Sequence, residues 1–261
     1  MIRILERSAT PPAMRRNRLG RLSEPQELFV ETLAAAGAVR VLEFDGVEGG
    51  YAITDGGDLL VEIHLEDRVL GKTEPALDAL VETAGVRRLL AQTFDPLAIL
   101  LGLARGSPPK ITAMLYRVIV DRGFQPRADL VARPGAPGDV AELAALSDDF
   151  FEGAPEIEAY LAAGGLMVYR RPEGELVGAG VMKRVIPGVD GVDIGMVVAP
   201  AHRRRGYGVH IVSHLKAHCL ASGWRPICGC AIDNHASQRT LERAGFASLH
   251  SSVEFALEES G

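Results

Sequence analysis

The chain has 261 residues and a formal net charge of −6, a balance that does not favour a nucleic-acid binder. No stretch approaches the length of a membrane span, so we expect no membrane partner. The length exceeds the usual span of one hydrophobic core and predicts two domains.

The first segment, residues 1–23, is a basic N-terminal arm. Its positive charges are Arg3, Arg7, Arg15, Arg16, Arg18 and Arg21. The arm lacks the apolar segment of a secretory signal, and we therefore expect a cytoplasmic protein. We expect a solvated arm or one that caps a domain; contact with an acidic partner, RNA or a membrane surface is the alternative.

Residues 24–126 alternate between strand-like and helix-like patterns. The predicted strands are 58–65, 86–94 and 111–120, and the predicted helices are 73–84 and 95–104. Gly85 ends the first helix, while Asp95 and Pro96 begin the second. A join to a second domain, residues 127–261, is expected at residues 122–126.

An acidic turn lies between two helical stretches near the start of the second domain. It consists of Asp148, Asp149 and Glu152. These carboxylates could bind a cationic amine; the alternative is a charged loop that is polar for solvation alone.

The most informative segment follows a predicted strand, Val192–Val198, which Pro200 ends. The segment itself is Arg203, Arg204, Arg205, Gly206, Tyr207 and Gly208. A helix with an apolar stripe begins at Gly208 and ends at Gly223. Because the first N–H groups of a helix have no partner within it, this glycine-containing turn with its arginine forks predicts a diphosphate site.

A buried strand, residues 225–232, leads into a short helix that ends at Gly245. Asp233 or Asn234 can serve as its N-cap. The nearby cysteines Cys219, Cys228 and Cys230 lack a second closely spaced ligand pair, so we expect no metal site. Their odd number suits reduced thiols and a cytoplasm.

The two halves contain an internal repeat. Gly85 and Asp95 are as far apart as Gly223 and Asp233, and the order strand, helix, strand, helix, strand recurs. In the first copy, the loop at residues 66–72 has two acids and one glycine, a composition that should repel a phosphate.

The second domain resembles the GNAT superfamily of N-acetyltransferases. Arg203–Gly208 fits the motif Q/R-x-x-G-x-G/A, and Asn234, Ser237, Gly245 and Phe246 fit N-x-x-S/A followed by G-F. The resemblance implies an α/β (α+β) fold, a mixed twisted sheet flanked by helices. The repeat implies two such domains in tandem, with residues 24–126 a degenerate GNAT-like domain without a cofactor site; an unrelated α/β domain is the alternative.

The resemblance further implies that acetyl-CoA is the acyl donor and lies where the sheet parts. The backbone of Met196, Val197 and Val198 would bind the pantetheine arm, and Arg203–Gly208 would hold the diphosphate. Asn234 and Ser237 would touch the pantetheine or the adenosine side. A small-molecule or peptide amine would be the acceptor, and the protein would be a monomer or a homodimer.

An amine acceptor must lose a proton before its nitrogen can attack a thioester. Asp193, on the strand that leads to the arginine-rich loop, is the candidate general base, and Glu152 is a second candidate; a solvent-facing aspartate is the alternative for Asp193. The expected activity is acetyl-CoA-dependent N-acetyltransfer to a primary amine by direct attack in a ternary complex. A non-catalytic CoA-binding regulatory or structural protein is the alternative.

One departure from the family pattern affects the general acid. Many family members place a tyrosine seven residues after the asparagine, and this chain has Leu241 there. The proton for the departing thiolate would then come from water, Ser237, Cys228 or Cys230.

Overall fold

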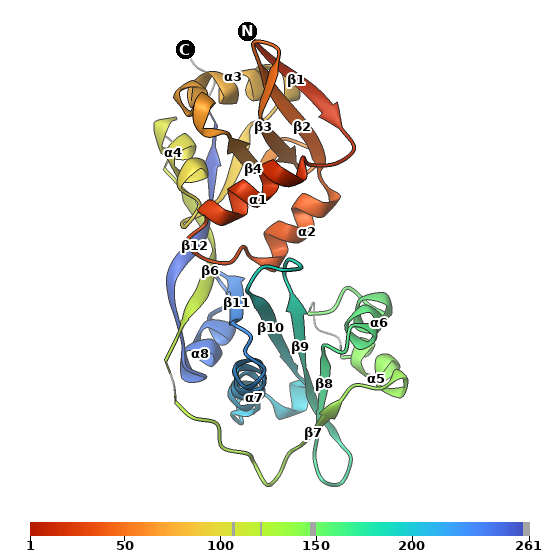
Figure 1. Cartoon of the computed structure of the whole chain (residues 1–261). Coiled ribbons are helices and arrows are strands. Elements are labelled where there is room, and N and C mark those ends of the chain that lie inside the picture. Colours follow the sequence, from red (N-terminus) through yellow and green to blue (C-terminus); the bar gives the residue numbers. More distant parts are fainter. Residues whose placement is uncertain (106–107, 121, 147–149, 258–261) are drawn as a thin grey trace. The chain divides into compact units, whose positions relative to one another are not determined.

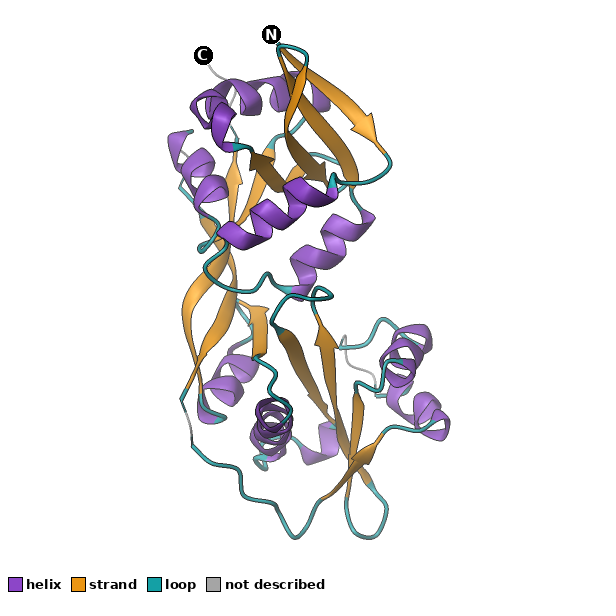
Figure 2. Cartoon of the chain, viewed as in Figure 1, coloured by secondary structure: helices purple, strands orange, loops and turns teal. Residues whose placement is uncertain are grey.

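The computed structural model describes residues 1–105, 108–120, 122–146 and 150–257. The chain folds into two compact units. Unit 1 is Met1–Leu115 together with His250–Gly261, and unit 2 is Tyr116–Leu249. Each unit contains a sheet flanked by helices (Figures 1 and 2), which confirms the predicted fold class.

The first repeat runs from β1 to β6. Its elements are β1 (Ile2–Arg7), α1 (Pro12–Arg21), α2 (Leu28–Ala36), β2 (Ala38–Phe44), β3 (Val47–Thr54), β4 (Leu59–Leu65), α3 (Thr73–Ala84), β5 (Arg88–Gln92), α4 (Pro96–Ala104) and β6 (Lys110–Ile119). A 3-10 helix, Asp67–Lys72, occupies the acidic loop that precedes α3. The predicted strands and helices between residues 58 and 120 are all present.

The second repeat has the same order of elements over the described residues. They are β7 (Val131–Pro134), α5 (Val140–Ala144), α6 (Ala154–Ala162), β8 (Leu166–Arg170), β9 (Leu176–Arg184), β10 (Val192–Val198), α7 (Tyr207–Ala221), β11 (Pro226–Ala231), α8 (His235–Arg243) and β12 (Phe246–Ala256). The internal repeat inferred from glycine and aspartate spacing is therefore a repeat of structure.

The last strand of each repeat crosses from one unit into the other. Residues 252–256 of β12 pair antiparallel with β5 in unit 1. In unit 2, β6 lies next to β11, and the Arg117 side chain donates a 2.9 Å hydrogen bond to the Cys228 carbonyl. The expected second domain, residues 127–261, therefore has other boundaries than unit 2, which begins at Tyr116 and ends at Leu249. The sequence could not show this, because the alternation of side chains along a strand does not reveal which sheet the strand joins.

The basic segment 1–23 is part of unit 1. β1 pairs antiparallel with β2, and α1 contacts β4. Most of its arginines pair with acids of unit 1, as Arg3 does with Glu43 and Arg7 with Glu48. The segment is thus an integral strand and helix whose charge is largely balanced within the unit.

In unit 2, helices cover opposite faces of the sheet. A Cβ atom placed on Gly180 of β9 would lie 2.7 Å from Leu215 of α7, so α7 packs closely against that face. A Cβ atom on Gly195 of β10 would instead lie 3.1 Å from Phe150, on the face covered by α5 and α6. The described residues contain no helix that is both long and apolar enough to span a bilayer.

Candidate functional site

The candidate site begins where two parallel strands stop pairing. β10 and β11 pair at Val192–Pro226 and Asp193–Ile227, whereas β10 continues to Val198 against β9. A cavity of about 720 Å³ opens beside the end of β10. A volume of this size is typical of sites for small molecules and cofactors.

The cavity brings together most of the residues that the sequence motifs single out. Its lining includes Met196, Val197, Val198, Arg203, Arg204, Gly206, Tyr207, Gly208, Asn234 and Ser237. Arg205, Asp193 and Glu152 do not belong to the described lining. The strand, the loop and the short helix, which are separated in sequence, thus face one space.

The turn before α7 has the backbone of an anion-binding loop. Arg204 and Gly206 both adopt left-handed conformations, with φ of 62° and 81°. Among the described residues, no side chain caps the N-terminus of α7. The first N–H groups of α7 therefore remain available for a negatively charged ligand, and the helix dipole adds to the attraction.

Tyr207 supports this turn from the protein side. Its hydroxyl donates to Oδ2 of Asp129 at 2.9 Å and accepts from Arg171 at 2.7 Å. The Arg127 guanidinium stacks over the Tyr207 ring at 4.4 Å and donates to the Arg205 carbonyl. Hydrogen bonds from Arg127 and Tyr207 hold the pKa of Asp129 well below its usual range, so this carboxylate stays charged.

The short helix α8 begins as the sequence predicts. Asn234 is the N-cap, and its side-chain oxygen accepts a 3.0 Å hydrogen bond from the Ser237 N–H. α7 approaches α8 closely: a Cβ atom on Gly208 would lie 3.3 Å from Thr240 and 3.5 Å from Met196. A small residue at position 208 therefore lets the strand and both helices meet at the cavity.

Asp193 lies on the α5–α6 face of the sheet, two residues before Gly195. It is half-buried and stands between Lys183 of β9 and Ile227 of β11 in register. Burial raises the pKa of the Tyr160 phenol of α6, and the Asp193 charge raises it further. Asp193 thus has a neighbouring phenol, while Phe150 of the cavity lining packs near Gly195.

The acidic turn has less structural support as part of the site than Asp193 has. Asp148 and Asp149 lie outside the described residues. Glu152 is exposed, and its backbone N–H donates to Glu156 at 2.8 Å at the start of α6.

The general-acid position is apolar. Leu241 is buried on α8, and Cys228 is buried on β11. Burial raises the pKa of the Cys228 thiol well above its ordinary value, so the thiol stays protonated at neutral pH. Of the proton donors that the sequence suggests, Ser237 lines the cavity.

Sequence reasoning missed two groups of residues around the cavity. Arg239 and Arg243 line it from α8. Their four-residue spacing on a short helix was the available signal. The support formed by Arg127, Asp129 and Arg171 has no such signal, because its members are 36 to 80 residues from Tyr207 in the chain.

Residues 140–246 match the model of the acetyltransferase (GNAT) family. This segment is therefore similar to a GNAT acetyltransferase domain. It contains β10, the arginine-rich turn and α8. A search of curated proteins found no match.

Solved structures share the fold over the whole chain. An acetyltransferase of the GNAT family from Colwellia psychrerythraea has a TM-score of 0.86 at 18% identity, covering 99% of this chain and all of that one. A tandem GNAT protein from the clavulanic acid biosynthesis pathway has a TM-score of 0.63 at 14% identity, with both chains fully covered. A GCN5-related N-acetyltransferase from Sphaerobacter thermophilus has a TM-score of 0.55 at 15% identity, covering 83% and 79%. The chain has a tandem GNAT fold.

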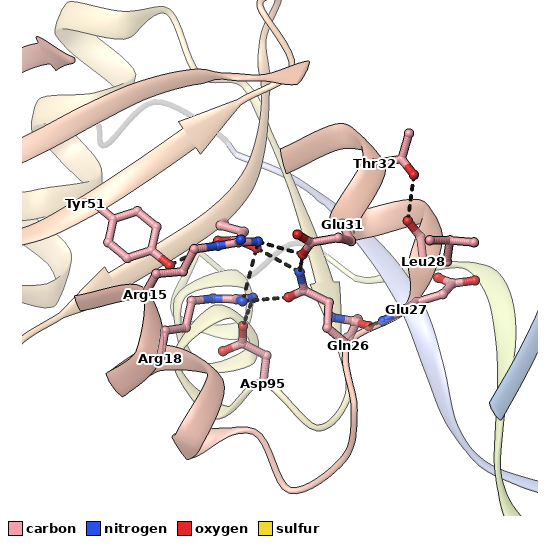
Figure 3. Close-up of polar contacts among 11 residues, drawn as sticks. Arg15, Arg18, Gln26, Glu27, Leu28, Glu31, Thr32, Tyr51 and Asp95 are labelled. Carbon is pink, nitrogen blue, oxygen red and sulfur yellow. Dashed lines mark hydrogen bonds and ion pairs between the residues drawn. The ribbon is translucent and has the colours of Figure 1, made fainter. Parts of the chain in front are cut away.

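The corresponding place in unit 1 contains a buried charge network (Figure 3). β4 and β5 pair in parallel at Leu59–Arg88 and Leu60–Leu89. Glu62 follows that pairing as Gly195 follows the pairing of β10 with β11. The side chain of Glu62 is fully buried, and its oxygen lies 3.3 Å from the Arg18 guanidinium.

Arg18 connects the two strands of unit 1 beyond their pairing. Its other nitrogen lies 2.7 Å from Asp95, the N-cap of α4 that follows β5. Gln26 accepts a 2.6 Å hydrogen bond from Arg18, and the Tyr51 hydroxyl donates to Glu62 at 3.0 Å. Burial raises the pKa of Glu62, but the charges of Arg18 and Arg15 outweigh burial and leave that pKa below its ordinary value.

Proposed function

We propose that unit 2 binds acetyl-CoA and transfers its acetyl group to a primary amine. One observation carries the proposal: the uncapped N-terminus of α7, with left-handed Arg204 and Gly206, opens on a cavity beside the parted strands β10 and β11. The turn would hold the diphosphate through backbone N–H groups and the Arg203 and Arg204 side chains.

The parted strand would hold the pantetheine arm. Met196, Val197 and Val198 end β10 at the cavity, and backbone groups at a parted edge can pair with an amide-containing chain. The Val198 carbonyl now accepts a 3.1 Å hydrogen bond from the Arg203 side chain, which the arm would have to share or replace. Asn234 and Ser237 would contact the same arm or the adenosine side from α8. Arg205, which does not belong to the described lining, would contribute through the long-range field of its charge.

Asp193 is the proposed general base. An alkylammonium acceptor gives up its proton, directly or through water, and the neutral nitrogen attacks the thioester carbonyl carbon. The C–N bond forms and gives a tetrahedral intermediate with a cationic nitrogen. As the C–S bond breaks, this nitrogen loses a proton, and water or Ser237 relays a proton to the departing thiolate. Glu152 is a second candidate for the proton transfer to solvent.

Thiol release from acetyl-CoA with a panel of amines tests the activity. We expect release with at least one small-molecule or peptide amine, and loss of that release when the Gly206 turn is blocked. Binding of CoA in calorimetry without release for any amine would contradict catalysis.

Binding of CoA without thiol release would indicate a different function, that of a CoA-binding protein without catalysis. The buried Leu241 at the usual tyrosine position favours it. The arginine-rich turn, Asn234 and the half-buried carboxylate of Asp193 on the α5–α6 face of the sheet favour the enzyme.

We further propose that unit 1 holds no acyl-CoA. The Arg18 guanidinium lies between Glu62 and Asp95, where a pantetheine arm would have to pass between the strands. Two acids, Glu66 and Asp67, precede α3 in place of the arginines that precede α7. Calorimetry should therefore give one CoA per chain; two sites of similar affinity would contradict the proposal.

A further inference from the structure

Four residues of α8 form one stripe along the cavity. Ala236, Arg239, Thr240 and Arg243 recur at steps of three and four residues, so they share one face of the helix, and all four line the cavity. Two small residues alternate with two arginines. The small residues leave room beside the helix, and the arginines place two positive charges on the wall of the cavity.

The side chains of these two arginines are open to a ligand. Both are exposed, and within the described part of the chain neither forms a hydrogen bond or an ion pair. By contrast, Arg127 and Arg171 are held by Asp129. Like charges four residues apart on a helix destabilise it, so an unpaired arginine pair facing a cavity is readily explained by an anionic ligand.

The diphosphate does not account for this pair. The N-terminus of α7 with Arg203 and Arg204 already supplies donors and charge for two phosphate groups. CoA carries a third phosphate, a monoester on the 3′ oxygen of its ribose, which bears about two negative charges near neutral pH because a phosphomonoester has its second pKa near 6. Two planar guanidinium groups suit such a dianion.

We infer that Arg239 and Arg243 bind the 3′-phosphate of the acyl-CoA, so that this protein selects CoA over 3′-dephospho-CoA. The inference rests on the proposed function of unit 2, since it assigns a further part of the same ligand. It makes the α8 stripe a specificity element, distinct from the turn that holds the diphosphate.

Calorimetric titration with CoA and with 3′-dephospho-CoA tests the inference. We expect the wild-type protein to bind CoA about 100-fold more tightly, as two charge-assisted hydrogen bonds would give. Arg239→Ala/Arg243→Ala should lose about that factor for CoA and stay within about threefold for dephospho-CoA. Arg239→Lys/Arg243→Lys keeps the charge without the planar fork and should retain part of the preference.

Arg16→Ala/Lys110→Ala is the matched control, because it removes two exposed charges from unit 1 and should leave both affinities unchanged. Equal weakening of both ligands by the α8 variant would overturn the inference and leave the proposed function standing. Wild-type protein that binds neither ligand would overturn both. Thermal unfolding of each variant shows whether a loss reflects misfolding.

Discussion

The Tyr207 hydroxyl donates a 2.9 Å hydrogen bond to Asp129, and this bond ties the first residue of α7 to the segment before β7. The turn before α7 is therefore supported from outside the helix that it begins. A ligand that needs several backbone N–H groups at once depends on such support, because a loose turn must first be ordered.

Tyr207→Phe should loosen the turn. The variant keeps the ring under Arg127 but removes the hydroxyl that contacts Asp129 and Arg171. We expect the KM for acetyl-CoA to rise about tenfold, the effect of one lost charge-assisted hydrogen bond, with kcat within about twofold. Tyr169→Phe is the control, because it loses a similar hydrogen bond to His214 away from the cavity. A fall in kcat at unchanged KM would contradict a positioning role.

Gly206→Trp should abolish CoA binding. Gly206 has a φ of 81°, which strains any L side chain, and a tryptophan there would occupy the cavity. Titration with CoA measures the loss. Gly188→Trp is the comparison, since Gly188 also has a positive φ but lies on an exposed loop with open space around it. Unchanged CoA affinity in the Gly206 variant would remove the turn from the binding site.

Asp193→Asn should slow turnover about 100-fold at neutral pH, within the usual range for loss of a general base. The defect should shrink toward pH 10, because the acceptor amine is then largely deprotonated without help. Asp190→Asn, a nearby exposed aspartate, should have little effect. Equal fractional loss at every pH would exclude Asp193 as the base, and Glu152→Gln would then be the next variant to measure.

Arg18→Met should destabilise the protein by about 3–5 kcal/mol in urea unfolding, because it leaves the buried Asp95 without its cation and the buried Glu62 with Arg15 alone. Arg16→Met, an exposed change on the same helix, should cost less than about 0.5 kcal/mol. If Arg18→Met cost as little unfolding free energy as Arg16→Met, the network would not be needed for stability.

Acid should reduce this Arg18→Met defect. In the wild type the pKa of Glu62 lies below its ordinary value, so the network contributes above about pH 4.3 and is lost as pH falls through the folded-state pKa. In the variant, Arg15 still lowers the pKa of Glu62, but the larger opposing charge of Arg18 is gone. Burial therefore raises the pKa of Glu62 above its wild-type value, and protonation costs the variant less stability as pH falls. The difference in unfolding free energy should therefore shrink between pH 7 and pH 4; a constant difference would contradict the network.

Much of unit 2 could be predicted from local sequence. The boundaries of β10 and α7 and the Asn234 cap follow from proline, glycine and side-chain periodicity, which act within a few residues. The role of Arg18 could not be predicted, because its partners are 44 and 77 positions away and only the folded sheet brings them together. For the same reason, the local sequence of residues 1–23 predicts only a basic arm.

The exchange of final strands separates the order of synthesis from the order of folding. Unit 1 begins at the first residue, yet β5 gains its β12 neighbour only from residues 252–256. During translation, the β5 edge of unit 1 therefore stays unpaired until residues 252–256 have left the ribosome. A nascent chain stalled before residue 250 would thus expose that edge to any strand that can pair with it.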